Sequence, residues 1–355
     1  MCDLTIITFV DVEKDIGTLR CTLDGFCRWQ SPEARARCQW IIIVQRPNAA
    51  EVHALCGGLP YPVDVFHDPA DFVDGYPVWD VNASIRRAWP LVRGRYVFIG
   101  HAEFLWLPGR LAATLEWLAA QRPYLALGNL RRFGNRDDVP TAYAPAGRTR
   151  ELSDGLTALL ESGQYDAAAD YANAVESLHW VYWGKPPVDG ATAWAEDVFF
   201  IDKDFAAVTR AFAHGGELPF QDCYDTTAKL CYYLGKYSMA PRVERAPRRT
   251  HEALHLWHRK QWGSFTPAMR EWFEAAPARW RETAFLRRDL WMELVAFRRD
   301  PLALPRADTA VVSLRQGPGG TCTRYAGACS QWLREGGADL VTEFYQQHGR
   351  DRREA

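Results

Sequence analysis

The first hundred residues alternate short apolar runs with segments whose apolar residues recur at helical spacing. The apolar runs are rich in β-branched residues, which predicts strands, and the segments between them predict helices. The expected strands are residues 4–10, 40–44, 63–66 and 96–100, and the expected helices are residues 15–29, residues 49–55 and a short helix opened by Asn82. Because strands and helices alternate, the pattern predicts a doubly wound, mostly parallel α/β sheet.

The pattern is less regular after residue 100. We expect strands at 124–127 and 198–201, and helices after Pro108, at 151–178, at 205–213 and from Asp225. After about residue 255 the sequence pattern changes, and residues 267–299 combine helical spacing of apolar residues with several Trp. The chain therefore predicts an α/β domain over residues 1–255 and a mainly helical accessory region over residues 256–355.

Composition narrows the class of protein. At 355 residues and 48% hydrophobic, the chain can bury a large core, and a net charge of −2 argues against a protein that is basic overall. The nine Cys follow no regular framework, which favours reduced thiols in the cytoplasm over disulfides. No apolar run is long enough for a signal peptide or a spanning helix. We expect a cytoplasmic protein, with contact to a membrane surface as an open alternative.

Candidate ligand-binding residues follow the predicted strands, where open α/β sheets bind their ligands. Thr8, Phe9 and Val10 end the first strand, and backbone groups with an aromatic ring can hold a nucleobase there. The plainer alternative is that the strand simply ends. Asp68 follows the third strand and can accept a hydrogen bond from a base or cap a turn before proline. With Asn82, these residues form the predicted nucleotide-binding set.

His101 and Glu103 follow the strand at 96–100. An imidazole and a carboxylate two residues apart can both face a divalent ion that is bound to phosphates. The alternative is that His101 hydrogen-bonds locally and Glu103 caps the next helix. This pair is the predicted metal-binding motif.

Asp222 and Asp225 precede a predicted helix in the segment DCYD. One of these aspartates can cap that helix. Alternatively, it can act as a general base that removes a proton from an acceptor hydroxyl. Glu196 and Asp197, in the segment AEDVFF, compete for the role of base.

Taken in order, these motifs resemble the GT-A glycosyltransferases, particularly the inverting family-2 group, over about residues 3–251. The segments that carry the resemblance are the strand that ends in Thr8-Phe9-Val10, then VNASIRRAWPLVRGRYVFIGHAEFLWLPGRL, VFFIDKDF, AHGGELPF, CYDTTAKLCYYLGK and PRRTHE. The family's Asp-x-Asp motif is His101-Ala102-Glu103 here, its Asp after strand two is Gln45, and its Glu-Asp motif is Tyr224-Asp225.

The resemblance implies a GT-A (Rossmann-like) sheet flanked by helices, with a C-terminal, mainly helical extension. It implies a nucleotide-sugar-dependent, hexosyltransferase-like enzyme that transfers a sugar to an acceptor hydroxyl with inversion. Asp225, with Asp222 beside it, would act as the catalytic base. His101, Glu103 and His251 would hold Mn²⁺ or Mg²⁺ in place of the usual carboxylates.

The acceptor stays open. Residues 242–260 carry six Arg and Lys against two Glu, which suits a lid that contacts the diphosphate, a lipid phosphate or a nucleic acid, or else a solvated basic face. The expected acceptors are a saccharide, a lipid-linked glycan or a small molecule, with a DNA-modifying enzyme as a minor variant. The Trp-bearing helices at 267–299 can pack as core or form a homodimer.

Two other functions compete with sugar transfer. The first is a non-catalytic GT-A-like binding protein with a degenerate metal site. The second is a nucleotidyltransferase-type α/β enzyme, which shares the sheet and the need for a metal-phosphate site. A dinucleotide-dependent oxidoreductase is disfavoured because no G-x-G-x-x-G motif follows the first strand.

Overall fold

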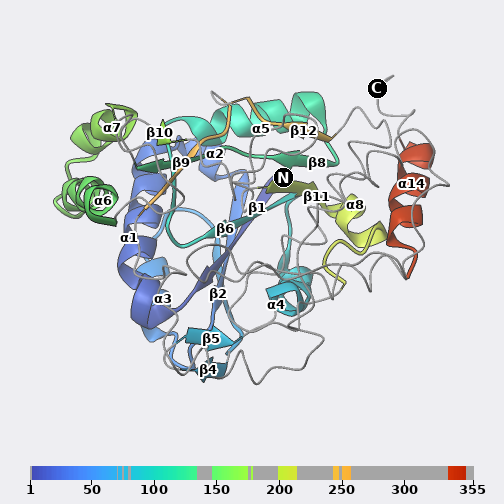
Figure 1. Ribbon diagram of the computed structural model, residues 1–355, viewed down its shortest axis with the longest axis horizontal. Coiled ribbons are helices and arrows are strands. Elements are labelled where there is room, and N and C mark those ends of the chain that lie inside the picture. The colour runs from blue at the N-terminus through green and yellow to red at the C-terminus, as the bar shows by residue number, and fades with distance from the viewer. Residues whose placement is uncertain are drawn as a thin grey trace.

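The main sheet of the molecule is mixed and doubly wound. The computed structural model describes residues 2–69, 71–73, 76–78, 81–133, 146–174, 177–178, 199–213, 243–247, 250–256 and 335–348. The strands of the main sheet are β1 (Leu4–Val10), β2 (Cys38–Val44), β3 (Val63–His67), β6 (Tyr96–His101), β8 (Leu125–Leu127), β11 (Phe199–Asp202) and β12 (Val243–Arg245). Their order is β12-β8-β11-β6-β1-β2-β3, and β11 alone runs antiparallel to its neighbours. The predicted α/β class with a mostly parallel sheet is confirmed (Figure 1).

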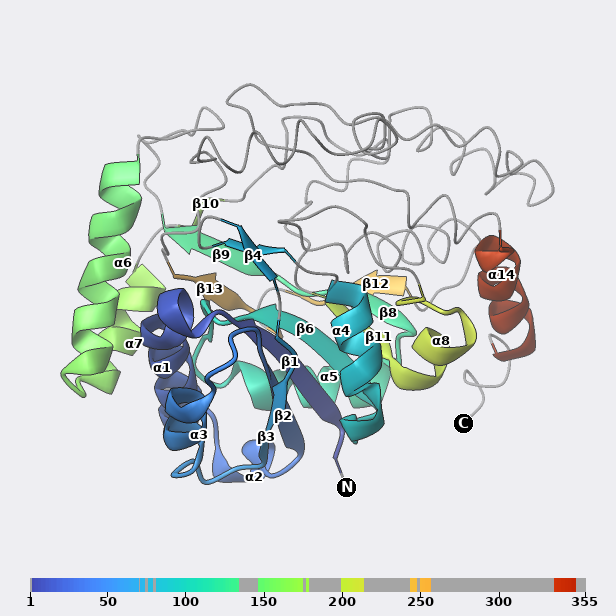
Figure 2. The same ribbon diagram turned by 90° about the horizontal axis from the view of Figure 1, so that it is seen from below.

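Helices cover the sheet, and its strands β1, β2 and β6 are buried along almost their whole length. Those of the N-terminal half are α1 (Val12–Trp29), α2 (Pro32–Arg35), α3 (Ala50–Cys56), α4 (Val81–Ala88), the 3-10 turn η1 (Trp89–Leu91) and α5 (Arg110–Gln121). Leu4, Ile6 and Val10 of β1 share a core cluster with residues of α1 and α5. Helices α8 (Lys203–Val208) and α14 (Gly337–His348) pack together at one end of the sheet (Figure 2).

A second, smaller sheet continues directly from β6. It consists of β7 (Phe104–Trp106), β9 (Leu130–Phe133), β10 (Ser177–Leu178) and β13 (Ala253–His255), in the order β10-β9-β13-β7. A separate hairpin joins β4 (Asp71–Val73) to β5 (Tyr76–Val78). This second sheet brings residues near 255 beside residues near 104, so it links distant parts of the chain.

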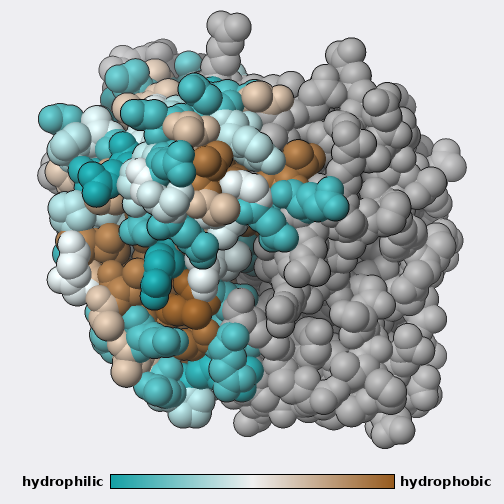
Figure 3. All heavy atoms as spheres, turned by 90° about the vertical axis from the view of Figure 1, so that its left-hand side faces the viewer, coloured by the Kyte–Doolittle hydropathy of each residue, from teal (hydrophilic) through white to brown (hydrophobic). Residues whose placement is uncertain are grey.

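Helices α6 (Ala146–Glu161) and α7 (Tyr165–Ala174) form a layer outside α1. The indole Nε1 of Trp29 donates to the carbonyl of Tyr165 at 3.0 Å and ties α1 to this layer. Figure 3 looks onto this side of the molecule, where hydrophilic residues surround a smaller group of hydrophobic ones.

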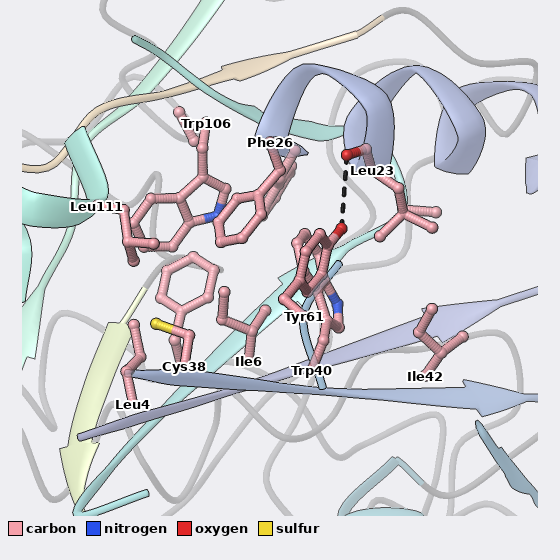
Figure 4. Packing of buried hydrophobic residues seen from close by; sticks show 14 of the residues in the cluster. Leu4, Ile6, Leu23, Phe26, Cys38, Trp40, Ile42, Tyr61, Trp106 and Leu111 are labelled. Atoms are coloured by element: carbon pink, nitrogen blue, oxygen red, sulfur yellow. Dashed lines mark hydrogen bonds between the residues drawn. The ribbon is translucent and has the colours of Figure 1, made fainter. Parts of the chain in front are cut away.

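Large aromatic side chains fill the core between α1 and the sheet. The ring of Phe26 lies 4.8 Å from that of Trp40 and 6.0 Å from that of Trp106, both edge-on, which is a favoured geometry for aromatic pairs. Tyr61 closes this cluster, and its hydroxyl donates to the carbonyl of Leu23 at 3.4 Å (Figure 4).

Gly94 makes the turn before β6, and close backbone approach requires a glycine there. A Cβ at this position would lie 2.4 Å from the backbone nitrogen of Thr5, which is too short for any side chain. The Gly94 N–H instead donates to the Thr5 hydroxyl at 2.8 Å. The turn therefore fixes the start of β6 against Thr5 of β1.

Two of the expected helices have other bounds in the structure than the sequence predicted. The helix expected over 151–178 is α6 and α7, separated at Gly163, where φ is +74°, and residues 177–178 are strand β10. The helix expected over 205–213 begins and ends earlier, as α8. The helix from Asp225 and most of the region 256–355 lie outside the described residues. In the described part of the chain, every helix is too short or too polar to cross a membrane.

Candidate functional site

The carboxyl ends of β1, β2, β3 and β6 meet at one edge of the main sheet. Val10 is level with Val44, Val44 with His67, and Phe9 with His101. The residues that follow these strands therefore lie along one rim. This juxtaposition is the one that the sequence pattern predicts for a ligand site.

The predicted triplet at the end of β1 contributes mainly backbone and one ring. The Thr8 side chain is fully buried, and its hydroxyl accepts a hydrogen bond from the Trp40 indole at 2.9 Å. Val10 belongs to the core, and its carbonyl accepts from the Gln45 N–H at 3.0 Å. Phe9 lies on the opposite face of the strand and is 6% exposed. Of these three side chains, Phe9 is the one that is not completely buried.

An ion pair that the sequence did not suggest lies beside this triplet. The Nε of Arg46 is 2.7 Å from Oδ1 of Asp11, whose side chain is fully buried, and Arg46 also lies 2.9 Å from Glu13. Asp11 directly follows β1, and Arg46 follows Gln45 at the end of β2. The only available signal was the position of these residues just past two predicted strands.

Asp68 is held by α4, which begins at Val81, so that Asn82 lies inside its first turn and does not open it as predicted. Arg87 donates to both carboxylate oxygens of Asp68, at 2.9 and 2.7 Å, and the Ser84 hydroxyl donates to the same carboxylate. Asn82 is fully buried in the first turn of α4. Asp68 therefore connects β3 to α4, a role that neither sequence alternative described.

The predicted metal-binding pair lies close together and has a third neighbour. Oε1 of Glu103 is 3.8 Å from Nδ1 of His101 and 3.7 Å from Nε2 of His255. All three side chains are largely buried, at 17%, 10% and 16% exposed for His101, Glu103 and His255. The ring of Phe104 packs on both imidazoles, at 4.8 and 5.5 Å between centroids. We call these three residues the His-Glu-His cluster.

His251, the third predicted metal ligand, lies in a different environment. Its ring is fully buried between Phe98, Trp106 and Phe200, with centroids at 5.3, 4.6 and 4.9 Å. Nδ1 accepts from the backbone N–H of Asn129 at 3.1 Å, so the proton of the neutral ring is on Nε2.

That tautomer leaves no lone pair of His251 free for a metal. Burial, with a contribution from the positive charge of Arg110, lowers the pKa of His251 to about 3, which keeps the ring neutral. This environment favours a structural role. His255, four residues later, is the histidine that meets Glu103.

The remaining predicted residues cannot be placed. Asp222 and Asp225, and their competitors Glu196 and Asp197, lie outside the described residues. Within the described ranges, no three His, Cys, Asp or Glu side chains form a ready-made metal site. The His-Glu-His cluster is thus a loose group rather than a closed one.

Comparisons with known proteins define no family for this chain. No protein-family model matches it, and no curated protein has a similar sequence. It is similar to a crystal structure of S. aureus TarS with 11% identity and a TM-score of 0.28, over 39% of this chain and 23% of that one. It is similar to S. aureus TarS 1-349 with 9% identity and a TM-score of 0.40, over 98% of this chain and 92% of that one. The chain thus spans under a quarter of the first of these two structures.

Proposed function

We propose that this chain is a glycosyltransferase that moves a sugar from a nucleotide-diphosphate donor to an acceptor hydroxyl with inversion. The observation that carries the proposal is the His-Glu-His cluster, which lies where β6 ends and level with Phe9. His101 and Glu103 match the resembling family's Asp-x-Asp motif in the sequence, and the His255 imidazole lies beside Glu103.

The reaction needs positive charge at this position. When the bond between the anomeric carbon and the diphosphate breaks, negative charge builds on the β-phosphate. A divalent ion held at the cluster would act as a Lewis acid toward this charge. His101, Glu103 and His255 are the residues that would hold it.

The donor atoms fit a first-row ion better than Mg²⁺. Two nitrogens and one oxygen suit Mn²⁺ or Zn²⁺, whereas Mg²⁺ prefers oxygen ligands. We propose Mn²⁺ as the ion that His101, Glu103 and His255 would hold.

The nucleoside end of the donor would lie along the same rim. The Phe9 ring offers an apolar surface for a base, and the Asp68 carboxylate, held in place by Arg87, offers acceptor oxygens. Asn82, buried in the first turn of α4, supports this side of the rim.

Asp225 would act as the general base, with Asp222 beside it. This assignment rests on the sequence motif alone. A carboxylate that removes the acceptor proton on the face opposite the leaving group gives inversion in one displacement. We infer a saccharide, a lipid-linked glycan or a small molecule as acceptor, and a homodimer as assembly.

A thermal-shift screen tests the proposal and separates it from its alternatives. UDP, GDP, dTDP and CDP are each added with and without Mn²⁺, and one of them should raise the melting temperature further when Mn²⁺ is present. Stabilisation by no diphosphate under either condition contradicts the proposal. The matching nucleoside triphosphates are screened in parallel, and stabilisation by one of them, with pyrophosphate release in a separate assay, indicates a nucleotidyltransferase instead.

The variant Asp225→Asn separates an enzyme from a binding protein. Once a donor and an acceptor are known, the variant should bind the donor as the wild type does and lose transfer. Donor binding without turnover in the wild type indicates a non-catalytic relative. Turnover that survives in Asp225→Asn removes Asp225 as the base.

A further inference from the structure

A fully buried threonine of α1 holds the turn that carries two members of the His-Glu-His cluster. The Thr22 hydroxyl donates to the carbonyl of Ala102 at 2.7 Å, across 80 positions of the sequence. Both residues are fully buried, and Ala102 is the residue between His101 and Glu103. A threonine inside a helix commonly donates to a carbonyl of the preceding turn of the same helix. The Thr22 hydroxyl instead reaches another element and ties α1 to the turn.

A glycine of α1 allows the helix to approach the strand that follows this turn. Gly25 is three residues after Thr22, so the two lie on the same side of α1. A Cβ on Gly25 would be 2.6 Å from Cδ1 of Leu105, which belongs to β7. Just past the end of α1, the Gln30 amide donates to the carbonyl of Leu107 at 3.0 Å. Polar groups of this segment thus hold the backbone both before and after β7.

A second element holds the next residue of the turn. The Leu256 N–H, directly after β13, donates to the carbonyl of Glu103 at 2.9 Å. The carbonyls of Ala102 and Glu103 therefore have donors on two different elements. Together these bonds fix the backbone of Glu103 relative to His101 in the same segment and to His255 on β13.

We propose that Thr22 is a positioning residue for the metal ion, because it holds the backbone that carries His101 and Glu103. This inference rests on the proposed function, in which these two side chains and His255 bind Mn²⁺. Without the Thr22 hydroxyl, the buried Ala102 carbonyl loses its donor, which raises the free energy of the folded state. The turn lowers this cost by shifting toward another donor, and the shift moves Glu103 relative to the two imidazoles.

The test is the affinity of the full-length protein for Mn²⁺, measured from the electron paramagnetic resonance signal of the free ion. Thr22→Val keeps the shape of the side chain but cannot donate, so it should bind Mn²⁺ roughly tenfold more weakly. Thr22→Ser restores the donor, and its affinity should return to that of the wild type.

Thr209→Val is the matched control. Thr209 is fully buried, and its hydroxyl donates to the carbonyl of Phe205 in α8 at 2.6 Å. Helix α8 lies at the other end of the main sheet from α1 (Figure 2). This variant loses the same kind of hydrogen bond, so it should lower the melting temperature as Thr22→Val does and leave the Mn²⁺ affinity unchanged. The comparison separates a positioning role from a general loss of stability.

A Thr22→Val protein that melts cooperatively and binds Mn²⁺ as tightly as the wild type overturns the inference and leaves the proposed function standing. The inference also fails if Thr22→Ser binds as weakly as Thr22→Val, or if Thr209→Val loses as much affinity. A wild type that binds no Mn²⁺ overturns the metal site of the proposed function and this inference with it. If Thr22→Val does not fold, Thr22→Ala, with a good helix former, takes its place with the same expected loss.

Discussion

The Nε2 nitrogen of His255 lies 3.7 Å from Oε1 of Glu103, although the two residues are far apart in the sequence. Strand pairing brings them together, because β13 runs antiparallel to β7 with His255 opposite Phe104. The Leu256 N–H also donates to the Glu103 carbonyl at 2.9 Å. The second sheet thus supplies a group that the segment around β6 lacks by itself.

Replacing His255 with Ala should weaken Mn²⁺ binding. If the His-Glu-His cluster holds the ion, loss of one of three ligands should lower its affinity roughly tenfold to a hundredfold or more. Titration calorimetry with MnCl₂ measures this. His53→Ala, at an exposed position on α3, is the matched control. Equal affinity in the wild type and both variants removes His255 from the site.

His251 should make folding stability depend on pH. Because its folded pKa is about 3 and its ordinary pKa is 6.5, the unfolded chain binds the extra proton between these values. The stability that the neutral ring provides is complete above pH 6.5 and is lost as the pH falls toward 3. Within that window, the unfolding free energy falls by about 1.4 kcal/mol for each pH unit.

Urea unfolding of wild type and His251→Gln at pH 7, 6 and 5 isolates this effect. The difference in unfolding free energy between the two proteins should shrink as the pH falls. His53→Gln should track the wild type at every pH. A difference that stays constant from pH 7 to 5 shows that folding does not change proton binding at His251, which contradicts the lowered pKa.

Arg87→Met should loosen α4 from β3. The Asp68 carboxylate loses two charge-assisted hydrogen bonds, but Arg87 is 53% exposed, so we expect a loss of only about 1 kcal/mol. Nucleoside diphosphate binding should weaken as well, because Asp68 is no longer held in place. Denaturant unfolding and calorimetry measure the two effects. Unaltered diphosphate affinity means that Asp68 does not meet the donor.

Gly94→Ala should destabilise the protein by about 2–3 kcal/mol, since a methyl group would overlap the backbone at Thr5. Gly17→Ala is the matched control. Nothing lies within 4 Å of a Cβ at Gly17, and the helical position should gain roughly 0.5–1 kcal/mol. If thermal unfolding gives the two variants the same sign, the turn at Gly94 is not as tight as described.

The sequence predicted the strands of the main sheet well, because each is a continuous apolar run bounded by polar residues. The runs at 4–10, 40–44 and 96–100 appear as β1, β2 and β6 within one or two residues. The short strand β7 was missed, since three apolar residues between Glu103 and Leu107 carry no periodicity. Strands β9, β10 and β13 depend on pairing with distant segments, which a local pattern does not encode.

The same limit applies to the site. The adjacency of His101 to Phe9 follows from strand ends in a parallel sheet, so the pattern could predict it. The pairing of His255 with Glu103 depends on the register of β13, and the burial of His251 depends on three aromatic rings from other strands. Sequence reasoning therefore paired Glu103 with His101, as the structure does, but named His251 and not His255 as the third member of the group.

Titration of the protein with the nucleoside diphosphate selected by the thermal-shift screen, with and without Mn²⁺, tests the central claim most directly. The account predicts one binding site per chain that needs Mn²⁺ and is strongly weakened in Glu103→Gln. Glu51→Gln, at an exposed position on α3, should bind as the wild type does. Diphosphate binding that is equally tight without Mn²⁺ and in Glu103→Gln would contradict the account.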